Sequence, residues 1–131
     1  MGLLTFKGGI HPNDGKSLAK DKAIVEVLPE GDLVFPLSQH IGAPAAPIVK
    51  VGDQVLKGQK IAEAGGFVSA PVYSSVSGKV KAIAPYFTPT GGKVSSIIIE
   101  NDGTYTEGER LNTRSLDLLT KEEMLNLIAE S

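Results

Sequence analysis

Short apolar runs separated by glycine-containing corners dominate residues 49–80 of this chain. Val49 and Val51 flank Lys50, so one face of this run is apolar and the other polar, the period-two pattern of a half-buried strand. Glycine suits sharp corners because it adopts positive φ without a steric penalty. The corners of this stretch contain Gly52, Gly58, Gly65, Gly66 and Gly78. The pattern predicts a compact β-sandwich with short crossings between its layers.

Further strands are predicted on both sides of this stretch. Their apolar runs are residues 24–28, 33–37, 81–83 and 94–100. Pro36 places the second run at a sheet edge or a bend, and three consecutive isoleucines predict burial of the last run on both faces. Residues 86–92 are predicted to form a loop. Residues 38–47 are rich in small residues and proline, which favours an extended connector held against the barrel.

The C-terminal residues follow a helical pattern. Thr120 begins a capping-box sequence, in which its hydroxyl oxygen accepts from the third helical amide while Glu123 reaches back. Apolar side chains recur at helical spacing behind it, at Met124, Leu125, Leu127 and Ile128. The predicted helix of about ten residues is too short to be stable alone in water and must dock on another surface. We divide the chain into a β domain with an N-terminal extension, residues 1–119, and a helix, residues 120–131.

Composition excludes several classes of function. The 131 residues carry a net charge of −2 with acidic and basic residues interspersed, which argues against a nucleic-acid surface. The chain contains no cysteine, so it holds neither a disulfide nor thiolate ligands for zinc or an iron–sulfur cluster. Its apolar runs are too short to span a bilayer, so we expect contact with a membrane only through a partner.

The stretch from "VKVGDQVLKGQKIAEA" to "SAPVYSSVSGKVKAI" resembles the barrel-sandwich hybrid fold of biotinyl and lipoyl carrier domains. We therefore predict a mainly β fold of this type with a short C-terminal helix. The resemblance implies that the modified lysine of a carrier would lie at a hairpin tip, here residues 64–68. This tip reads AGGFV and offers no amine to acylate, so the resemblance extends to the fold and not to the carrier function.

Few residues are candidates for chemistry, and no recognisable active site emerges. Lys7 next to Gly8 and Gly9 could cradle a phosphate, but the spacing of a P-loop is absent. His11 and His40 could bind a metal or relay a phosphoryl group, although no acid accompanies them at a motif spacing. An alternative function follows from these histidines: a phosphotransfer domain resembling the sugar phosphotransferase IIA proteins. It requires the two imidazoles to lie within a few ångströms of each other.

Three segments together carry a more specific resemblance: TFKGGIHP at residues 5–12, PLSQHIGAPA at residues 36–45 and the glycine-rich stretch at residues 49–83. With the "IIIENDG" strand and the C-terminal helix, the chain resembles the N-terminal domain of the RnfC family over essentially its whole length. Members of this family are the C subunits of Rnf electron-transport complexes. The resemblance implies a parent subunit that binds FMN and NAD(H) and holds two [4Fe–4S] clusters. It also implies a complex that couples electron transfer between ferredoxin and NAD to ion movement across the bacterial cytoplasmic membrane.

By this resemblance, the glycine-rich nucleotide loop of the family is expected to begin where this chain ends. None of these cofactors can therefore be assigned to residues of the chain. We therefore expect a non-catalytic scaffold on the cytoplasmic face of the membrane, bound peripherally, while the parent complex is an NAD-linked oxidoreductase and translocase. Its expected partners are the flavin/NADH and ferredoxin-like domains of the same subunit and other subunits of the complex. The candidate docking strips are Lys7, Gly8, Gly9, Ile10 and His11, and Gln39, His40 and Gly42.

Overall fold

The computed structural model describes residues 12–89, 91–108 and 119–130. Its elements, in chain order, are a 3-10 helix η1 (Lys16–Leu18), the strands β1 (Asp32–Pro36), β2 (Ala46–Pro47), β3 (Gln54–Val55), β4 (Lys60–Glu63), β5 (Val72–Tyr73), β6 (Gly78–Phe87) and β7 (Lys93–Asn101), and the helix α1 (Lys121–Glu130). The described part of the chain is thus mainly β with one short α-helix, as the sequence predicts.

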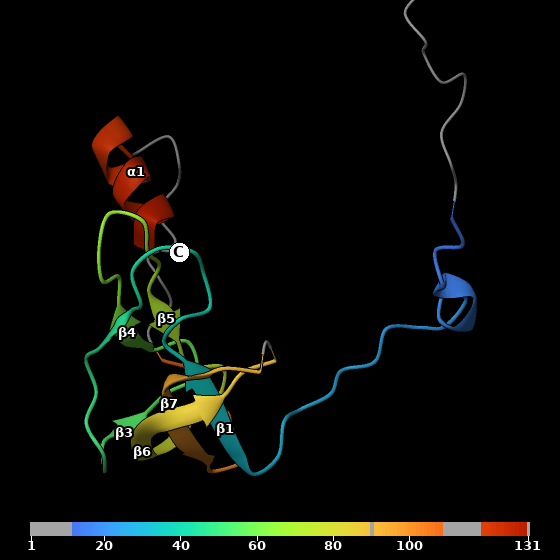
Figure 1. Ribbon diagram of the computed structural model, residues 1–131, viewed down its shortest axis with the longest axis horizontal. Coiled ribbons are helices and arrows are strands. Elements are labelled where there is room, and N and C mark those ends of the chain that lie inside the picture. The colour runs from blue at the N-terminus through green and yellow to red at the C-terminus, as the bar shows by residue number, and fades with distance from the viewer. Residues whose placement is uncertain (1–11, 90, 109–118, 131) are drawn as a thin grey trace, which may run out of the picture.

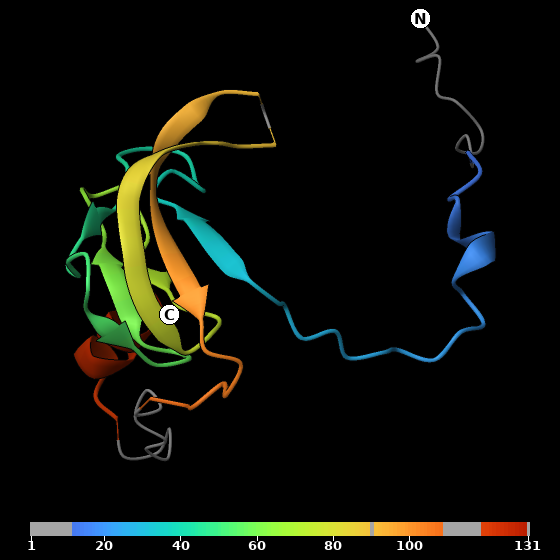
Figure 2. The ribbon, with the colours of Figure 1, turned by 90° about the horizontal axis from the view of Figure 1, so that it is seen from below.

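Two antiparallel sheets form the body (Figure 1). One has the strand order β1-β7-β6-β3 and the other has the order β2-β4-β5. The β6–β7 hairpin is the longest pairing, running from Gly78 opposite Asn101 to Phe87 opposite Lys93. Figure 2 shows that this hairpin bends along its length, so that its sheet curls instead of lying flat.

Side chains from both sheets form one buried core. Its members are Phe35, Leu37, Ala45, Val49, Val55, Ile61, Ala62, Val72, Val76, Val80, Ile97 and Ile99. The isoleucines of β7 alternate as the pleat requires: Ile97 and Ile99 are completely buried, whereas Ile98 on the opposite face is only half-buried. The predicted burial on both faces of this strand is therefore only partly correct.

The N-terminal run at residues 24–28 does not form the strand that its composition predicts. A strand needs a neighbouring strand to satisfy its backbone groups. Here the chain leaves the barrel before β1, and within the described residues no backbone hydrogen bond joins residues 23–28 to another segment (Figure 2). The run at residues 33–37 is confirmed as an edge strand, β1, in which Pro36 lies opposite Ser96.

Two further local predictions are wrong. Val51 is exposed and lies in a turn, because the Lys50 amide donates to the Asp53 carboxylate and the Asp53 amide donates back to the Lys50 carbonyl. Residues 86–92 are not all loop, because β6 stays paired with β7 as far as Phe87.

The C-terminal helix begins as its capping box predicts. The Glu123 amide donates to Thr120 Oγ1 at 3.3 Å, and the Thr120 amide donates to Glu123 Oε2 at 2.8 Å. Met124 and Leu127 are half-buried, whereas Leu125 and Ile128 are exposed. The helix therefore leaves part of its apolar face exposed.

Candidate functional site

The predicted connector, residues 38–47, ends in the strand β2 (Ala46–Pro47), and we keep the name connector for residues 38–45. It is fastened to the hairpin loop, residues 64–71, which joins β4 to β5. The Ala43 amide donates to the Val68 carbonyl at 3.0 Å. Ser69 Oγ bridges the two segments, donating to the Ala43 carbonyl at 2.8 Å and accepting from the Gly65 amide at 2.9 Å. We call the connector and the hairpin loop together the projection. The prediction that the connector is held against the barrel is confirmed, and its place of contact is the hairpin loop.

His40 is part of this attachment. The Ala70 amide donates to His40 Nε2 at 3.2 Å, so Nε2 acts as an acceptor and the ring proton lies on Nδ1. His40 Nδ1 lies 2.9 Å from the Ile41 carbonyl and donates to it. Both ring nitrogens are thus engaged with backbone groups. This arrangement gives a half-buried structural histidine and does not support the phosphotransfer alternative, whose second histidine, His11, lies outside the described residues.

Two glycines allow the backbones of the projection to come this close. A Cβ atom on Gly42, whose φ is +93°, would lie 2.0 Å from the Val68 carbonyl oxygen. A Cβ atom on Gly65 would lie 2.0 Å from the Pro44 carbonyl oxygen. No real Cβ atom fits at these distances, so the contact between connector and loop requires glycine at both positions.

The projection presents apolar side chains to solvent. Phe67 at the loop is fully exposed, Ile41 of the connector is 85% exposed and Val68 is 50% exposed. In Figure 1 the connector and the hairpin loop rise toward the end of the barrel at which α1 lies. A rigid backbone that carries an exposed aromatic side chain has the features of a protein-binding surface, since aromatic residues dominate the binding energy of such surfaces.

The predicted docking residues fall in two groups. Lys7, Gly8, Gly9, Ile10 and His11 lie outside the described residues. Gln39, His40 and Gly42 lie in the connector, and each has a local structural contact: Gln39 Nε2 donates to the Pro36 carbonyl at 2.9 Å. Phe67 belongs to the hairpin tip but is not among the residues that the sequence singled out. An aromatic residue at a tip otherwise made of small residues was the available signal.

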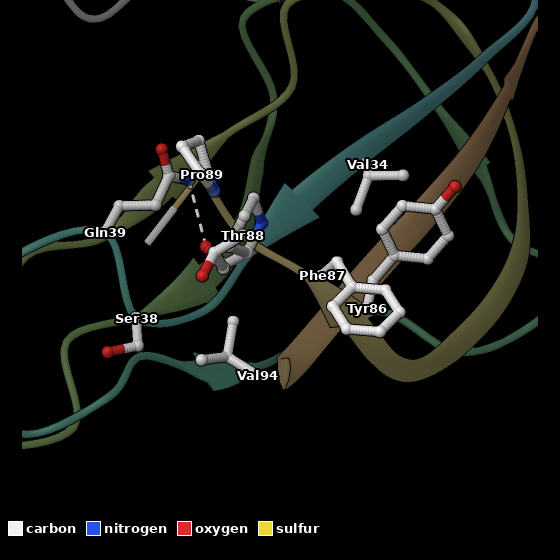
Figure 3. A pocket seen from close by; sticks show the side chains of 9 residues that line it. Val34, Ser38, Gln39, Tyr86, Phe87, Thr88, Pro89 and Val94 are labelled. Carbon is white, nitrogen blue, oxygen red and sulfur yellow. Dashed lines mark hydrogen bonds between the residues drawn. The ribbon is translucent and has the colours of Figure 1, made fainter. Parts of the chain in front are cut away.

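A shallow groove of about 630 Å³ lies at the start of the connector (Figure 3). Its walls include Val34 and Val94 from the sheet, Tyr86 and Phe87 from the end of β6, and Gln39. None of the described side chains that line it is charged. Nearby, Lys93 Nζ lies 4.7 Å from the centroid of the Phe87 ring. The groove is a mainly apolar surface without the convergent polar groups of a phosphorylated-cofactor site.

The chain lacks the ligands that the expected iron–sulfur clusters of the parent subunit need. Iron–sulfur clusters are held by cysteine thiolates, and the sequence contains none. Among the described residues, no three histidine or acidic side chains lie together in a way that could hold a metal ion. No described helix is both long and apolar enough to cross a membrane.

Comparison with known proteins identifies relatives of the whole chain. The model of one protein family, described as the RnfC barrel sandwich hybrid domain, matches residues 4–104. The C subunit of the proton-translocating ferredoxin:NAD(+) oxidoreductase complex of Clostridium ljungdahlii is 47% identical over 131 residues, covering 98% of this chain and 28% of that protein.

Two further relatives carry similar names. The C subunit of the Na(+)-translocating ferredoxin:NAD(+) oxidoreductase complex of Acetobacterium woodii is 46% identical over 102 residues, which cover 78% of this chain and 23% of that protein. The C subunit of the ion-translocating oxidoreductase complex of Klebsiella pneumoniae is 39% identical over 125 residues, covering 94% of this chain and 16% of that protein. The chain therefore spans less than a third of the length of these curated relatives.

Proposed function

This chain belongs to the RnfC barrel sandwich hybrid domain family, and we propose that it is the docking domain of the RnfC subunit in an ion-translocating ferredoxin:NAD oxidoreductase complex. The names of its relatives support this assignment, since each is the C subunit of an ion-translocating oxidoreductase complex. In this proposal the domain performs no catalysis itself. It holds the subunit in place for electron transfer that occurs in other parts of the complex.

FMN, NAD(H) and two [4Fe–4S] clusters would bind to the part of the subunit outside this chain. The absence of cysteine from the sequence supports this division of labour, because cluster ligands must then come from other segments. We place the subunit peripherally on the cytoplasmic face of the membrane. It would meet the membrane only through other subunits of the complex.

The projection is the observation that carries the proposal. Its backbone is fixed by hydrogen bonds at Ala43, Ser69 and Ala70, so little conformational entropy remains to be lost on binding. Phe67 is nevertheless fully exposed at its surface. In a carrier domain this loop would present an acylated lysine. Here it would present an aromatic anchor to the flavin/NADH domain of the same subunit or to a neighbouring subunit.

The test uses Phe67→Ser and Ile41→Ser in the full-length subunit, with Val51→Ser as the matched control. Val51 is also exposed, but it lies in the turn before β3. In Figure 1 β3 and α1 lie at opposite ends of the barrel. Loss of an aromatic anchor weakens binding by about 2 kcal/mol, or about thirtyfold in affinity. We expect less RnfC subunit in the purified complex and slower ferredoxin:NAD electron transfer for Phe67→Ser, and no change for the control. Full assembly and full activity of both projection variants would reject the proposal.

A further inference from the structure

An N-terminal arm, residues 23–28, extends away from the barrel (Figure 2). Its apolar side chains are exposed. Ile24 is fully exposed, and Val25 and Val27 are each more than 80% exposed. Leu28 is 51% exposed. Isolated exposed apolar residues are common on protein surfaces, but four within five residues are a concentration typical of a binding segment.

The base of this arm is held in a defined position. The Pro29 carbonyl accepts from Asn101 Nδ2 at 2.7 Å and also from the Tyr105 hydroxyl. Tyr105 has a φ of +52°, and among the described residues it is the only non-glycine residue with a positive φ. This conformation costs about 1–2 kcal/mol for an L-residue. Asn101 and Tyr105 thus fix the point at which the arm leaves the barrel.

The arm has the composition and the free backbone groups of a strand without a neighbour. Ile24, Val25 and Val27 are β-branched residues that favour strands. No backbone hydrogen bond joins residues 23–28 to any other described residue. An extended segment of this kind can bind by adding itself as a strand to an exposed sheet edge, with alternate side chains filling pockets.

We propose that the arm pairs as an extra strand with a sheet edge in the part of the same full-length subunit that lies outside this chain. This proposal rests on the proposed function, since it assumes a subunit of the length of the relatives, of which the chain spans 28% or less. An uncovered apolar strand invites aggregation. A cover within the same polypeptide protects the arm before the complex assembles, whereas another subunit would protect it only afterwards.

A second copy of this chain is a poor alternative. Among the described strands, the outermost strands of the two sheets are β1, β2, β3 and β5, and of these only β1 is longer than two residues. Because β3 pairs with β6 only at Gly78 and Lys79, the part of β6 beyond Val80 is also an open edge, and it contains Pro85. The β1 edge contains Pro36, which has no amide hydrogen to donate. The chain therefore lacks, in its described residues, a proline-free edge as long as the arm.

Hydrogen exchange of the full-length subunit tests the proposal, first alone and then in the assembled complex. We expect the amides of residues 24–28 in the subunit alone to exchange at least about tenfold more slowly than in an unstructured peptide of the same sequence, with no further slowing on assembly. Exchange at the peptide rate in both samples would overturn the proposal. Slowing only in the complex, or slowing that grows with protein concentration, would also overturn it, in favour of another subunit or a second copy.

A proline variant distinguishes loss of strand pairing by the arm from unfolding of the barrel. Val27→Pro removes one amide hydrogen from the strand, so residues 24–28 should lose their protection, while the amides of β7 keep theirs as a control for folding. Continued protection of residues 24–28 in this variant would contradict strand pairing. The result is independent of the Phe67→Ser test, because protection is measured in the lone subunit and docking of the projection is measured by assembly.

Discussion

The curled sheet and the projection are held together by different kinds of contact. In the sheet, β7 lies between β1 and β6, and Ile97, Ile99 and Val80 are buried almost completely. In the projection, hydrogen bonds and close backbone approaches at Gly42 and Gly65 hold two loops whose large apolar side chains face solvent. The first region stabilises the fold through buried apolar area. The second holds a surface in shape and leaves its apolar side chains available for a partner.

The largest effect should come from the sheet. Ile97→Ala removes a completely buried side chain from the central part of the core. We expect it to lower the free energy of unfolding by about 2–5 kcal/mol, from lost burial and the cavity left behind. Chemical denaturation of the chain measures this loss. A change below about 1 kcal/mol would mean that the sheet is not the source of stability.

The next effect should come from the projection and has a matched control. Gly42 and Gly52 have φ angles of +93° and +98°, so alanine costs similar backbone strain at both positions. A Cβ atom at Gly42 meets the Val68 carbonyl, whereas at Gly52 it meets no atom within 4 Å. We expect Gly42→Ala to destabilise by about 1–3 kcal/mol more than Gly52→Ala. Equal losses in denaturation would show that the connector does not need its close contact with the hairpin loop.

The smallest effect concerns acid stability at the end of the sheet. The backbone amide of Thr104 and then the hydroxyls of Ser77 and Thr104 lower the pKa of Asp102 below its ordinary value of 3.8. A lowered folded pKa means that the ionised carboxylate adds stability above about pH 3.8 and loses this contribution as pH falls through the folded pKa.

Asp102→Asn should therefore be less stable than the parent near neutral pH, and the difference should shrink in acid. Denaturation curves at several pH values compare the two proteins. A difference that stays constant from neutral pH into acid would contradict ionisation of Asp102 as its source.

Local patterns in the sequence predicted local structure well. The capping box at Thr120 involves residues that are close in sequence, and it is confirmed. The edge position of the strand containing Pro36 is also confirmed, and it follows from proline itself, which has no amide hydrogen to donate. The run at residues 24–28 has the composition of a strand, but a strand also needs a neighbouring edge, which composition does not supply. Val51 follows the alternating pattern, but the Lys50–Asp53 turn exposes it.

The candidate site was harder to predict than the fold. The connector was recognised from its motif, and Gln39, His40 and Gly42 do lie in the projection. Phe67 was not selected, because its exposure depends on contacts between loops that are separated by more than 20 residues. Such contacts leave only weak signals in a single sequence, here the glycines at which the two backbones meet.

Hydroxyl-radical footprinting of Phe67 tests the docking role of the projection most directly. Phe67 should be oxidised rapidly in the 131-residue chain, where its side chain is fully exposed, and several-fold more slowly in the full-length subunit within its complex. Phe87, exposed at the end of β6, serves as the internal reference. Slower oxidation of Phe67 relative to Phe87 in the complex is the predicted result. Equal rates for Phe67 in the chain and in the complex would contradict the proposal that the projection docks.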